Sequence, residues 1–209
     1  MDTERSVRGI AVVALDPQAI RANFRCRGFS RKAAFYTQSL DLPRYRRRGG
    51  WDRVASPFTA HPTYMRLQQV HRHVYRLLNP EQRELIASGA SVPEAQKLAE
   101  QMPETISEKR LQRYLQLLEH MARDGYRQEL SPDYMGIAIA RDGSAVKVSE
   151  GNHRLAAAQL LGLPRIVAEV RYVHESWFRE RVKSRRGSAP ADIRAVLAEL
   201  DNLQEVWPP

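Results

Sequence analysis

The chemically richest stretch of this 209-residue sequence is residues 149–154. Here a serine, a glutamate, a glycine, an asparagine, a histidine and an arginine follow one another between a β-like run and an alanine- and leucine-rich helical pattern. A helix that begins near Asn152 leaves its first backbone N–H groups without partners inside the helix, and the helix dipole adds positive potential at that end. The stretch therefore predicts an anion site at a helix start.

The side chains of this stretch would each add to such a site. Gly151 permits a sharp turn and a close approach of a ligand because it has no Cβ. Asn152 can cap the helix, Arg154 adds a fixed charge with forked donors, and His153 adds a donor that can also carry a proton. Glu150 would act as a proton acceptor or as a ligand to Mg²⁺. A simpler interpretation is also open, namely a capped helix start in which Arg154 pairs with Glu150.

The elements that must position these residues are indicated by the flanking sequence. Residues 135–141 predict a strand, Asp142-Gly143 predicts a tight hairpin turn, and residues 146–148 predict the antiparallel partner. Residues 153–161 predict a helix that ends at a Leu-Gly pair, and residues 165–172 predict a third strand. The expected order is hairpin, glycine-containing loop, helix and strand.

A longer helix is expected before this block. Thr105-Ile106-Ser107-Glu108 fits a capping box, with Thr105 as the N-cap and Glu108 as the returning carboxylate. Apolar side chains then recur at helical spacing from Leu111 to Ala122, and Gly125 is a natural end.

The N-terminal half predicts one strand and several helices. Residues 8–15 read as a strand closed by Asp16-Pro17. Residues 62–78 read as one amphipathic helix ended by Asn79-Pro80, and residues 80–100 as one or two short helices split by Gly89 and Pro93. No internal repeat is visible.

Two segments carry much of the positive charge. Residues 21–53 mix arginines with aromatic side chains, either as an irregular segment whose aromatics pack inside or as a basic lip over an anion site. The tail has a basic stretch, residues 179–186, and then an amphipathic helix expected from Pro190 to Leu203.

Composition limits the classes of function. Lysine and arginine number 33 against 24 acidic residues, so the net charge is +9 and anionic ligands or nucleic acid are favoured, although a generally basic surface is the simpler interpretation. A single cysteine, Cys26, excludes a disulfide framework. Without a signal-like apolar run we expect a cytoplasmic protein, and without GxxxxGK[ST] we expect no P-loop.

The block around residues 104–175 resembles the ParB/sulfiredoxin-like superfamily. The resemblance is carried by the hairpin at Asp142-Gly143 and by Glu150-Gly151-Asn152-His153-Arg154 followed by an alanine-rich helix, Leu-Gly and a strand. It implies an α+β core whose loop and helix start bind nucleotide phosphates. Gly50-Trp51-Asp52, Ser56-Pro57-Phe58, His174 and Trp177 are similar to an uncharacterised prokaryotic branch.

At several positions the chain departs from the pattern of the superfamily, and these departures exclude some of the activities known for its members. Sulfiredoxins place a reactive cysteine where this chain has Asn152, so sulfinic-acid repair is not expected. Partition proteins carry Glu-Arg-Arg in the loop and a DNA-binding domain after the core, whereas this chain has Asn-His-Arg and only residues 176–209. The free-serine kinase branch has an acidic residue, Gly, x, His and Arg, which Glu150–Arg154 matches.

We therefore expect an α+β fold with a mostly helical N-terminal elaboration (residues 1–103), a ParB/sulfiredoxin-like core (residues 104–175) and a basic linker with a C-terminal helix (residues 176–209). The expected function is an ATP-dependent phosphotransferase acting on a small molecule, with ATP or another nucleoside triphosphate or diphosphate and Mg²⁺. The alternative is a nucleotide-gated or electrostatic DNA-binding module, related to the ParB-like or nuclease-like members. An active enzyme is thus the leading interpretation.

The expected site residues fall into three groups. Glu150 and His153 are the catalytic candidates, with Glu150 also the candidate Mg²⁺ ligand. The phosphate-binding candidates are Ser149, Gly151, Asn152, His153 and Arg154. A substrate pocket is expected from Arg47, Arg48, Trp51, His174 and Trp177, although packing alone would also explain the last two.

Overall fold

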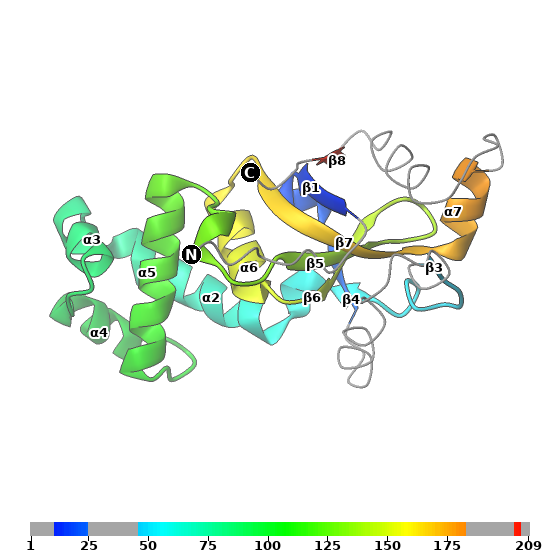
Figure 1. The fold of residues 1–209 in the computed structure, drawn as a ribbon. Helices are drawn as coiled ribbons and strands as arrows, with labels where there is room; N and C mark the ends of the chain where they lie inside the picture. The colour runs from blue at the N-terminus through cyan, green and yellow to red at the C-terminus, as the bar shows by residue number, and fades with distance from the viewer. Residues whose placement is uncertain (1–10, 25–45, 183–202, 206–209) are drawn as a thin grey trace. The chain divides into compact units, whose positions relative to one another are not determined.

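The computed structural model describes residues 11–24, 46–182 and 203–205 (Figure 1). These residues form two compact units. The sheet unit comprises the described residues of segments 1–58, 128–151 and 164–209, and the helical unit comprises residues 59–127 and 152–163. Each unit thus draws on separate parts of the chain.

The sheet unit is built on one mixed sheet with the order β4-β2-β6-β5-β7-β1-β8, in which β3 also pairs with β7. Its strands are β1 (Ala11–Leu15), β2 (Ala22–Asn23), β3 (Arg46–Arg47), β4 (Ser56–Pro57), β5 (Met135–Ile139), β6 (Ala145–Ser149), β7 (Ile166–His174) and β8 (Leu203–Glu205). β5 pairs antiparallel with β6 and parallel with β7, so it lies between them (Figure 1). The expected hairpin and third strand are confirmed.

Two bulges face each other across β5. Gly136 lies opposite Ser149 and Ile137 opposite Lys147, so Val148 is an extra residue in β6. On the other side of β5, Ile137 lies opposite Val170 and Ala138 opposite Tyr172, so Arg171 is an extra residue in β7. Bulges redirect side chains and are frequent beside functional sites.

One face of the sheet packs around Trp51. Its indole contacts the ring of Tyr172 edge-on, with 5.1 Å between ring centroids, and Ala138, Ala140 and Val146 complete this buried cluster. Trp51 therefore belongs to the interior, as one of the two interpretations of the segment 21–53 expected. Residues 25–45 of that segment lie outside the described residues.

The helical unit is organised around the long helix α5 (Figure 1). Its helices are α2 (Pro62–His73), η4 (Tyr75–Leu77, a 3-10 helix), α3 (Pro80–Ala87), α4 (Pro93–Glu100), α5 (Glu108–Asp124) and α6 (Asn152–Leu161). The apolar stripe of α5 is buried, as expected, and α6 packs against α2 and α5. The helix predicted after the loop is confirmed, as are the two short helices.

The end of the first predicted helix differs from the prediction. The helix from Pro62 ends at His73, because Val74 leaves the helical region and Asn79 begins a new helix with its own capping box to Gln82. The residue before a proline disfavours helical backbone, so Asn79-Pro80 suits a helix start.

The capping box predicted at Thr105 is wrong. α5 begins at Glu108 with Ser107 as the N-cap, and Ser107 makes no side-chain cap hydrogen bond. The Glu108 carboxylate accepts a hydrogen bond from Gln96 Nε2 at 2.6 Å, so it serves the contact with α4 instead. Glu108 therefore binds a side chain of another helix and not the backbone at Thr105, as the capping box would require.

The remaining described elements are three 3-10 helices and one short α-helix. β1 ends at Asp16-Pro17 as predicted, and Asp16 caps the 3-10 helix η1 (Pro17–Ala19). The others are η3 (Phe58–Ala60), η5 (Gln128–Leu130) and α7 (Glu175–Val182). Leu203, expected in a helix, lies in β8 beside β1, so the prediction is wrong there; residues 183–202 lie outside the described part.

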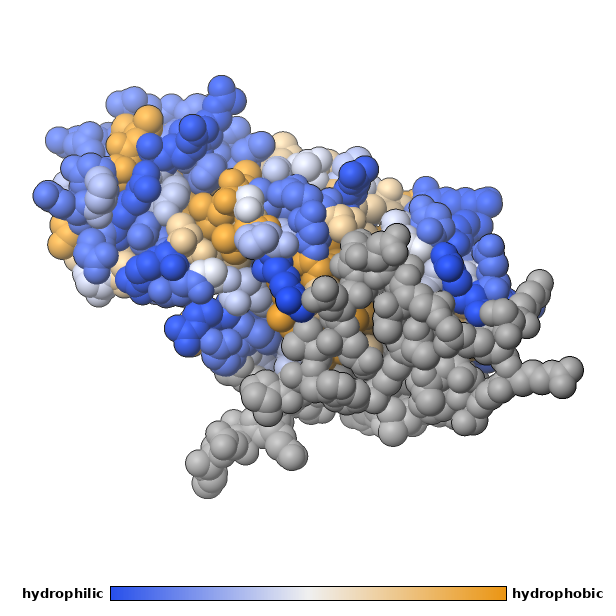
Figure 2. Space-filling view, turned by 90° about the horizontal axis from the view of Figure 1, so that it is seen from above, coloured by the Kyte–Doolittle hydropathy of each residue, from blue (hydrophilic) through white to orange (hydrophobic). Residues whose placement is uncertain are grey.

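The observed fold class is α+β with a mixed sheet, as expected. No helix in the described ranges has the length and apolar character needed to cross a membrane. In the view of Figure 2, hydrophilic residues make up most of the coloured surface and the hydrophobic ones lie in separate patches. The exposed large apolar side chains are far apart in sequence: Val54, Met65, Leu77, Leu85 and Leu130.

Candidate anion site

The loop between β6 and α6 has an unusual backbone. β6 ends at Ser149 and α6 begins at Asn152. Between them, Glu150 has φ +29° and Gly151 has φ +74°. Among the non-glycine residues that the structure describes, Glu150 alone has a positive φ. A bulky side chain in this region costs free energy, so the surrounding structure must hold it there.

Gly151 is required by space as well as by its φ angle. A Cβ atom on Gly151 would lie 2.8 Å from the Cβ of Met135, which is fully buried at the start of β5. Real Cβ atoms do not approach so closely, and Met135 cannot easily move away because it belongs to β5. The glycine that the sequence marked as a turn residue is thus also a packing residue, and it fixes where the loop leaves β6.

In the first turn of α6, His153 is exposed, whereas Asn152 and Arg154 are half-buried. Residues 155–158 are buried, which explains the run of leucine and alanines, because small side chains allow α2 and α5 to approach. Arg154 donates a hydrogen bond from Nη1 to the Tyr126 hydroxyl at 3.2 Å, and its guanidinium lies 5.9 Å from that ring. Tyr126 thereby orients the arginine, a partner that the sequence did not suggest.

His153 is exposed, but one side of its ring faces Tyr114, with 5.6 Å between ring centroids. The partial loss of solvent lowers the pKa of His153, and the positive charge of Arg110 acts in the same direction. The imidazole is therefore neutral at pH 7, one ring nitrogen donating and the other accepting. This protonation state suits the exchange of a proton better than the permanent binding of an anion.

The glutamate of the loop has a charged partner in the sheet unit. Arg171 Nη2 lies 3.6 Å from Glu150 Oε2 and 2.7 Å from Glu169 Oε2. Glu169 is 1% exposed and the Arg171 side chain 10%, whereas 44% of the Glu150 side chain is exposed. Arg171 and Glu169 were missed by the sequence reasoning; two charges within an otherwise apolar strand were the available signal.

Ser149 lies at the end of β6 opposite Gly136. Its backbone oxygen accepts a hydrogen bond from the ammonium group of Lys147, which is fully buried. The loop is therefore anchored to the sheet by a buried cation at its first residue. A buried ammonium needs such acceptors, because an unpaired charge in the interior is very costly.

The predicted substrate pocket residues are gathered in the sheet unit, mostly in its interior. Trp51 and Trp177 are 8% and 2% exposed, and His174 is 3% exposed. Arg47 packs its guanidinium over Tyr172 at 4.5 Å. Arg48 is largely exposed and lies 4.0 Å from Glu175. The arrangement of the two tryptophans and His174 favours the packing interpretation over contact with a substrate.

His174 belongs to a clamp formed by Gly49, Asp52, Arg141 and His174. His174 Nε2 lies 2.9 Å from the carbonyl oxygen of Gly49, and Nδ1 accepts the backbone N–H of Ser176 at 3.1 Å. A carbonyl oxygen only accepts, so Nε2 carries the proton. Arg141 Nε and Nη2 each donate a hydrogen bond to the Asp52 carboxylate, both at 2.6 Å. The polar groups of these four residues bind one another, so we interpret the clamp as stabilising the fold and not as contacting a substrate.

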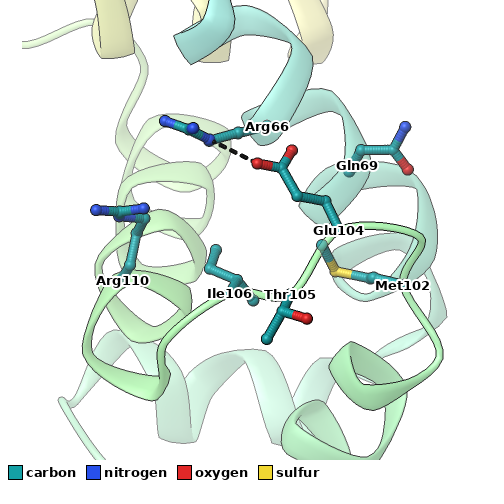
Figure 3. A pocket seen from close by; sticks show the side chains of 7 residues that line it. All are labelled: Arg66, Gln69, Met102, Glu104, Thr105, Ile106 and Arg110. Atoms are coloured by element: carbon teal, nitrogen blue, oxygen red, sulfur yellow. Dashed lines mark hydrogen bonds and ion pairs between the residues drawn. The ribbon is translucent and has the colours of Figure 1, made fainter.

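A separate pocket lies in the helical unit (Figure 3). Arg66 donates to the Glu104 carboxylate at 3.0 Å, and Arg110 also lines the pocket. The loop residues Met102, Thr105 and Ile106 also line a wider groove of about 390 Å³. That groove carries the two carboxylates Glu100 and Glu108, so its lining does not suit an anion.

No group of three or more metal-ligating side chains occurs among the described residues. Mg²⁺ in phosphate-transfer sites usually binds one or two carboxylates and the phosphates themselves, so a single exposed glutamate is a sufficient protein ligand. Glu150 fits this description. Comparison of the chain with family models, with curated proteins and with solved structures found no match.

Proposed function

We propose that the protein binds a nucleotide through residues 149–154 and transfers a phosphoryl group from it to a small molecule. We further infer that the sheet and the helix after it form a core of the ParB/sulfiredoxin type. A cytoplasmic location fits this activity.

The observation that carries the proposal is the backbone of Glu150. A glutamate with φ +29° directly before a glycine with φ +74° and a ten-residue helix is a strained connection. Glycine, asparagine or aspartate would tolerate this backbone better than glutamate does. Strain of this kind concentrates at functional sites, where the side chain matters more than the local stability.

Each residue of the loop has a distinct task under this proposal. The backbone N–H groups at the start of α6 and the Arg154 guanidinium hold phosphate oxygens. His153, neutral and exposed, donates a hydrogen bond to the transferred group or passes a proton. Glu150 accepts the proton of the attacking hydroxyl or binds Mg²⁺. When bound, Mg²⁺ would neutralise the developing charge on the phosphates.

The resemblance of residues 150–154 to the kinase branch of the superfamily adds support from an independent direction. The order acidic residue, glycine, x, histidine, arginine matches that branch, with glutamate in the acidic position. The departure at Asn152 removes the cysteine that sulfinic-acid repair requires. A phosphotransferase is therefore the member activity that the residues support best.

A thermal-shift titration with ATP, ADP, CTP and GTP, each with and without Mg²⁺, tests the proposal. A nucleotide present at 100 times its Kd stabilises the protein by about 2.7 kcal/mol. We expect a saturable rise in Tm with at least one nucleotide and loss of the rise in Arg154→Ala. The absence of any nucleotide response in the wild-type protein would refute the proposal.

A further inference from the structure

The groove of about 390 Å³ in the helical unit lies between the end of α4 and the start of α5. Its volume is within the range of small-ligand sites. Apolar and polar side chains line it in equal number: Ala99, Met102, Ile106 and Leu111, and Gln96, Glu100, Thr105 and Glu108. Leu111 is buried, whereas Glu100 and Glu108 are exposed. The groove therefore combines an apolar lining with two accessible carboxylates.

The two sides of the groove are joined by Gln96. Its Nε2 donates a hydrogen bond to Ser91 Oγ at 3.1 Å and another to Glu108 Oε1 at 2.6 Å. These bonds connect the residues before α4 with the first residue of α5, through a side chain of α4. A ligand would therefore enter a groove whose sides are already held in place, which reduces the entropy lost on binding.

The two carboxylates of the groove have no cationic partner within the described residues, although the chain carries a net charge of +9. The only hydrogen bond given to the Glu108 side chain there comes from the neutral Gln96. Nearby cations are engaged with other carboxylates, since Lys97 lies 4.0 Å from Glu94 and Arg66 lies 3.0 Å from Glu104. Two negative charges therefore face the groove without a described counter-charge.

The position of Glu100 adds to this negative potential. Glu100 is the last residue of α4, where the helix dipole is negative and a cationic side chain would be stabilising. A glutamate at this end is repelled by the dipole, so it does not stabilise the helix. The same arrangement attracts a positively charged ligand, because the carboxylate and the helix end act in the same direction.

We propose that this groove binds a protonated amine carried on an apolar stem. The stem packs against Ala99, Met102, Ile106 and Leu111, and the ammonium group lies at the carboxylates of Glu100 and Glu108. Both free alkylamines and lysine side chains have this chemistry. None of residues 149–154 lines the groove, so the inference goes beyond the proposed phosphotransferase and does not depend on it.

Methyl NMR of the full-length protein tests the groove, because Met102, Ile106 and Leu111 place methyl-bearing side chains in its lining. The protein is titrated at constant ionic strength with n-hexylamine, with n-hexanol and with ammonium chloride. We expect these methyl signals to shift saturably with hexylamine, to show about tenfold weaker affinity for hexanol, which lacks the charge, and not to respond to ammonium, which lacks the stem.

A parallel titration with Nα-acetyl-lysinamide distinguishes the two sources of the amine. Tighter binding than that of hexylamine would assign the groove to a lysine side chain, and weaker binding would assign it to a free alkylamine. Either result retains the protonated amine and the apolar stem as the features that the groove recognises.

Substitution of the carboxylates tests their role. Glu100→Gln and Glu108→Gln should each weaken hexylamine binding about threefold, and the double variant about tenfold, because an exposed ion pair contributes modestly. Hexanol affinity should not change. Glu94→Gln is the matched control, since Glu94 is an exposed residue of the same helix that does not line the groove, and it should bind hexylamine as the wild type does.

The stability of Glu100→Gln separates a ligand-binding role from a structural one. We expect its Tm to equal or exceed that of the wild type, because a negative charge has left the carboxyl end of α4. Any nucleotide-induced rise in Tm should be the same in the double variant as in the wild type, so the two sites can fail independently. Equal affinities for hexylamine and hexanol, or wild-type hexylamine affinity in the double variant, would overturn the inference.

Discussion

Arg141 and Asp52, which are 89 residues apart in sequence, form a two-pronged ion pair in which both guanidinium–carboxylate distances are 2.6 Å. Arg141 Nη2 also donates to the Gly49 carbonyl oxygen at 3.0 Å. The pair joins the turn after β3 to the turn of the β5–β6 hairpin. Because Trp51 directly precedes Asp52, the ion pair also fixes the backbone that places the indole in its buried cluster.

Asp52→Asn should lower the free energy of unfolding at pH 7, because it leaves Arg141 without its counter-charge. The hydrogen bonds from Arg141 hold the pKa of Asp52 well below its usual range. The ion pair therefore contributes its full stability above the unfolded-state pKa, about 3.8, and loses it as the pH falls further. Urea denaturation between pH 2 and 7 should show this loss in the wild type and a flatter profile in the variant.

The exposed Glu180 provides the control for this prediction. Glu180→Gln should change the stability at pH 7 by less than about 0.5 kcal/mol. Equal stabilities of wild type and Asp52→Asn at pH 7 would show that the Arg141 pair makes no net contribution.

Gly151→Ala should destabilise the protein by about 1–3 kcal/mol, because alanine at φ +74° is strained and its Cβ would collide with Met135. Gly50→Ala is the matched control, since that position has open space and no positive φ. Chemical denaturation compares the two variants. If Gly151→Ala proved as stable as Gly50→Ala, the loop would have to be looser than its packing against Met135 implies.

Arg154→Ala should weaken nucleotide binding by about 10- to 100-fold, the effect of removing a charge-assisted donor to phosphate. The free energy of unfolding should change little, because alanine has the highest helix propensity and the substitution leaves the backbone at the start of α6 unchanged. Calorimetry measures the affinity and denaturation the stability. Tyr126→Phe, which keeps the ring but removes the hydroxyl that Arg154 donates to, should have an intermediate affinity. An unfolded Arg154→Ala protein would instead identify the arginine as structural.

Glu150→Gln should reduce phosphoryl transfer by about 100-fold or more, because the substitution removes the proton acceptor or metal ligand and keeps the size of the side chain. Nucleotide affinity without Mg²⁺ should be retained or increased, since a negative charge beside the phosphates has gone. Turnover and affinity are therefore measured in the same variant. Turnover at the wild-type level would remove Glu150 from the catalytic residues and leave its pairing with Arg171 as its role.

Binding to duplex DNA should be weak, independent of sequence and lost by about 200 mM salt, because a net charge of +9 spread over the chain allows only a few phosphate contacts. Fluorescence anisotropy with two unrelated duplexes across a salt series measures this. Tight binding to one duplex at 200 mM salt would favour the DNA-binding alternative over the phosphotransferase.

Much of the local structure was predictable from the sequence. The hairpin at Asp142-Gly143, the helix from Asn152 to Leu161 and the strand after it were recognised from turn residues and apolar periodicity. These signals act over a few residues, where backbone preferences decide the outcome. For the same reason the polar residues of 149–154 could be placed at a helix start.

Partners distant in the sequence were decided only by the tertiary structure. Glu108 bonds to Gln96 and not to its own helix start, and Glu150 lies beside Arg171, whose direction depends on a bulge in β7. Tyr126 at Arg154 and Arg141 at Asp52 are likewise products of chain packing. Periodicity identifies which residues share a face, but strand order and register determine which charges meet. The sequence alone therefore determined the hairpin, the helix and strand that follow it and the polar loop between them, whereas folding selected the partners of the side chains in that loop.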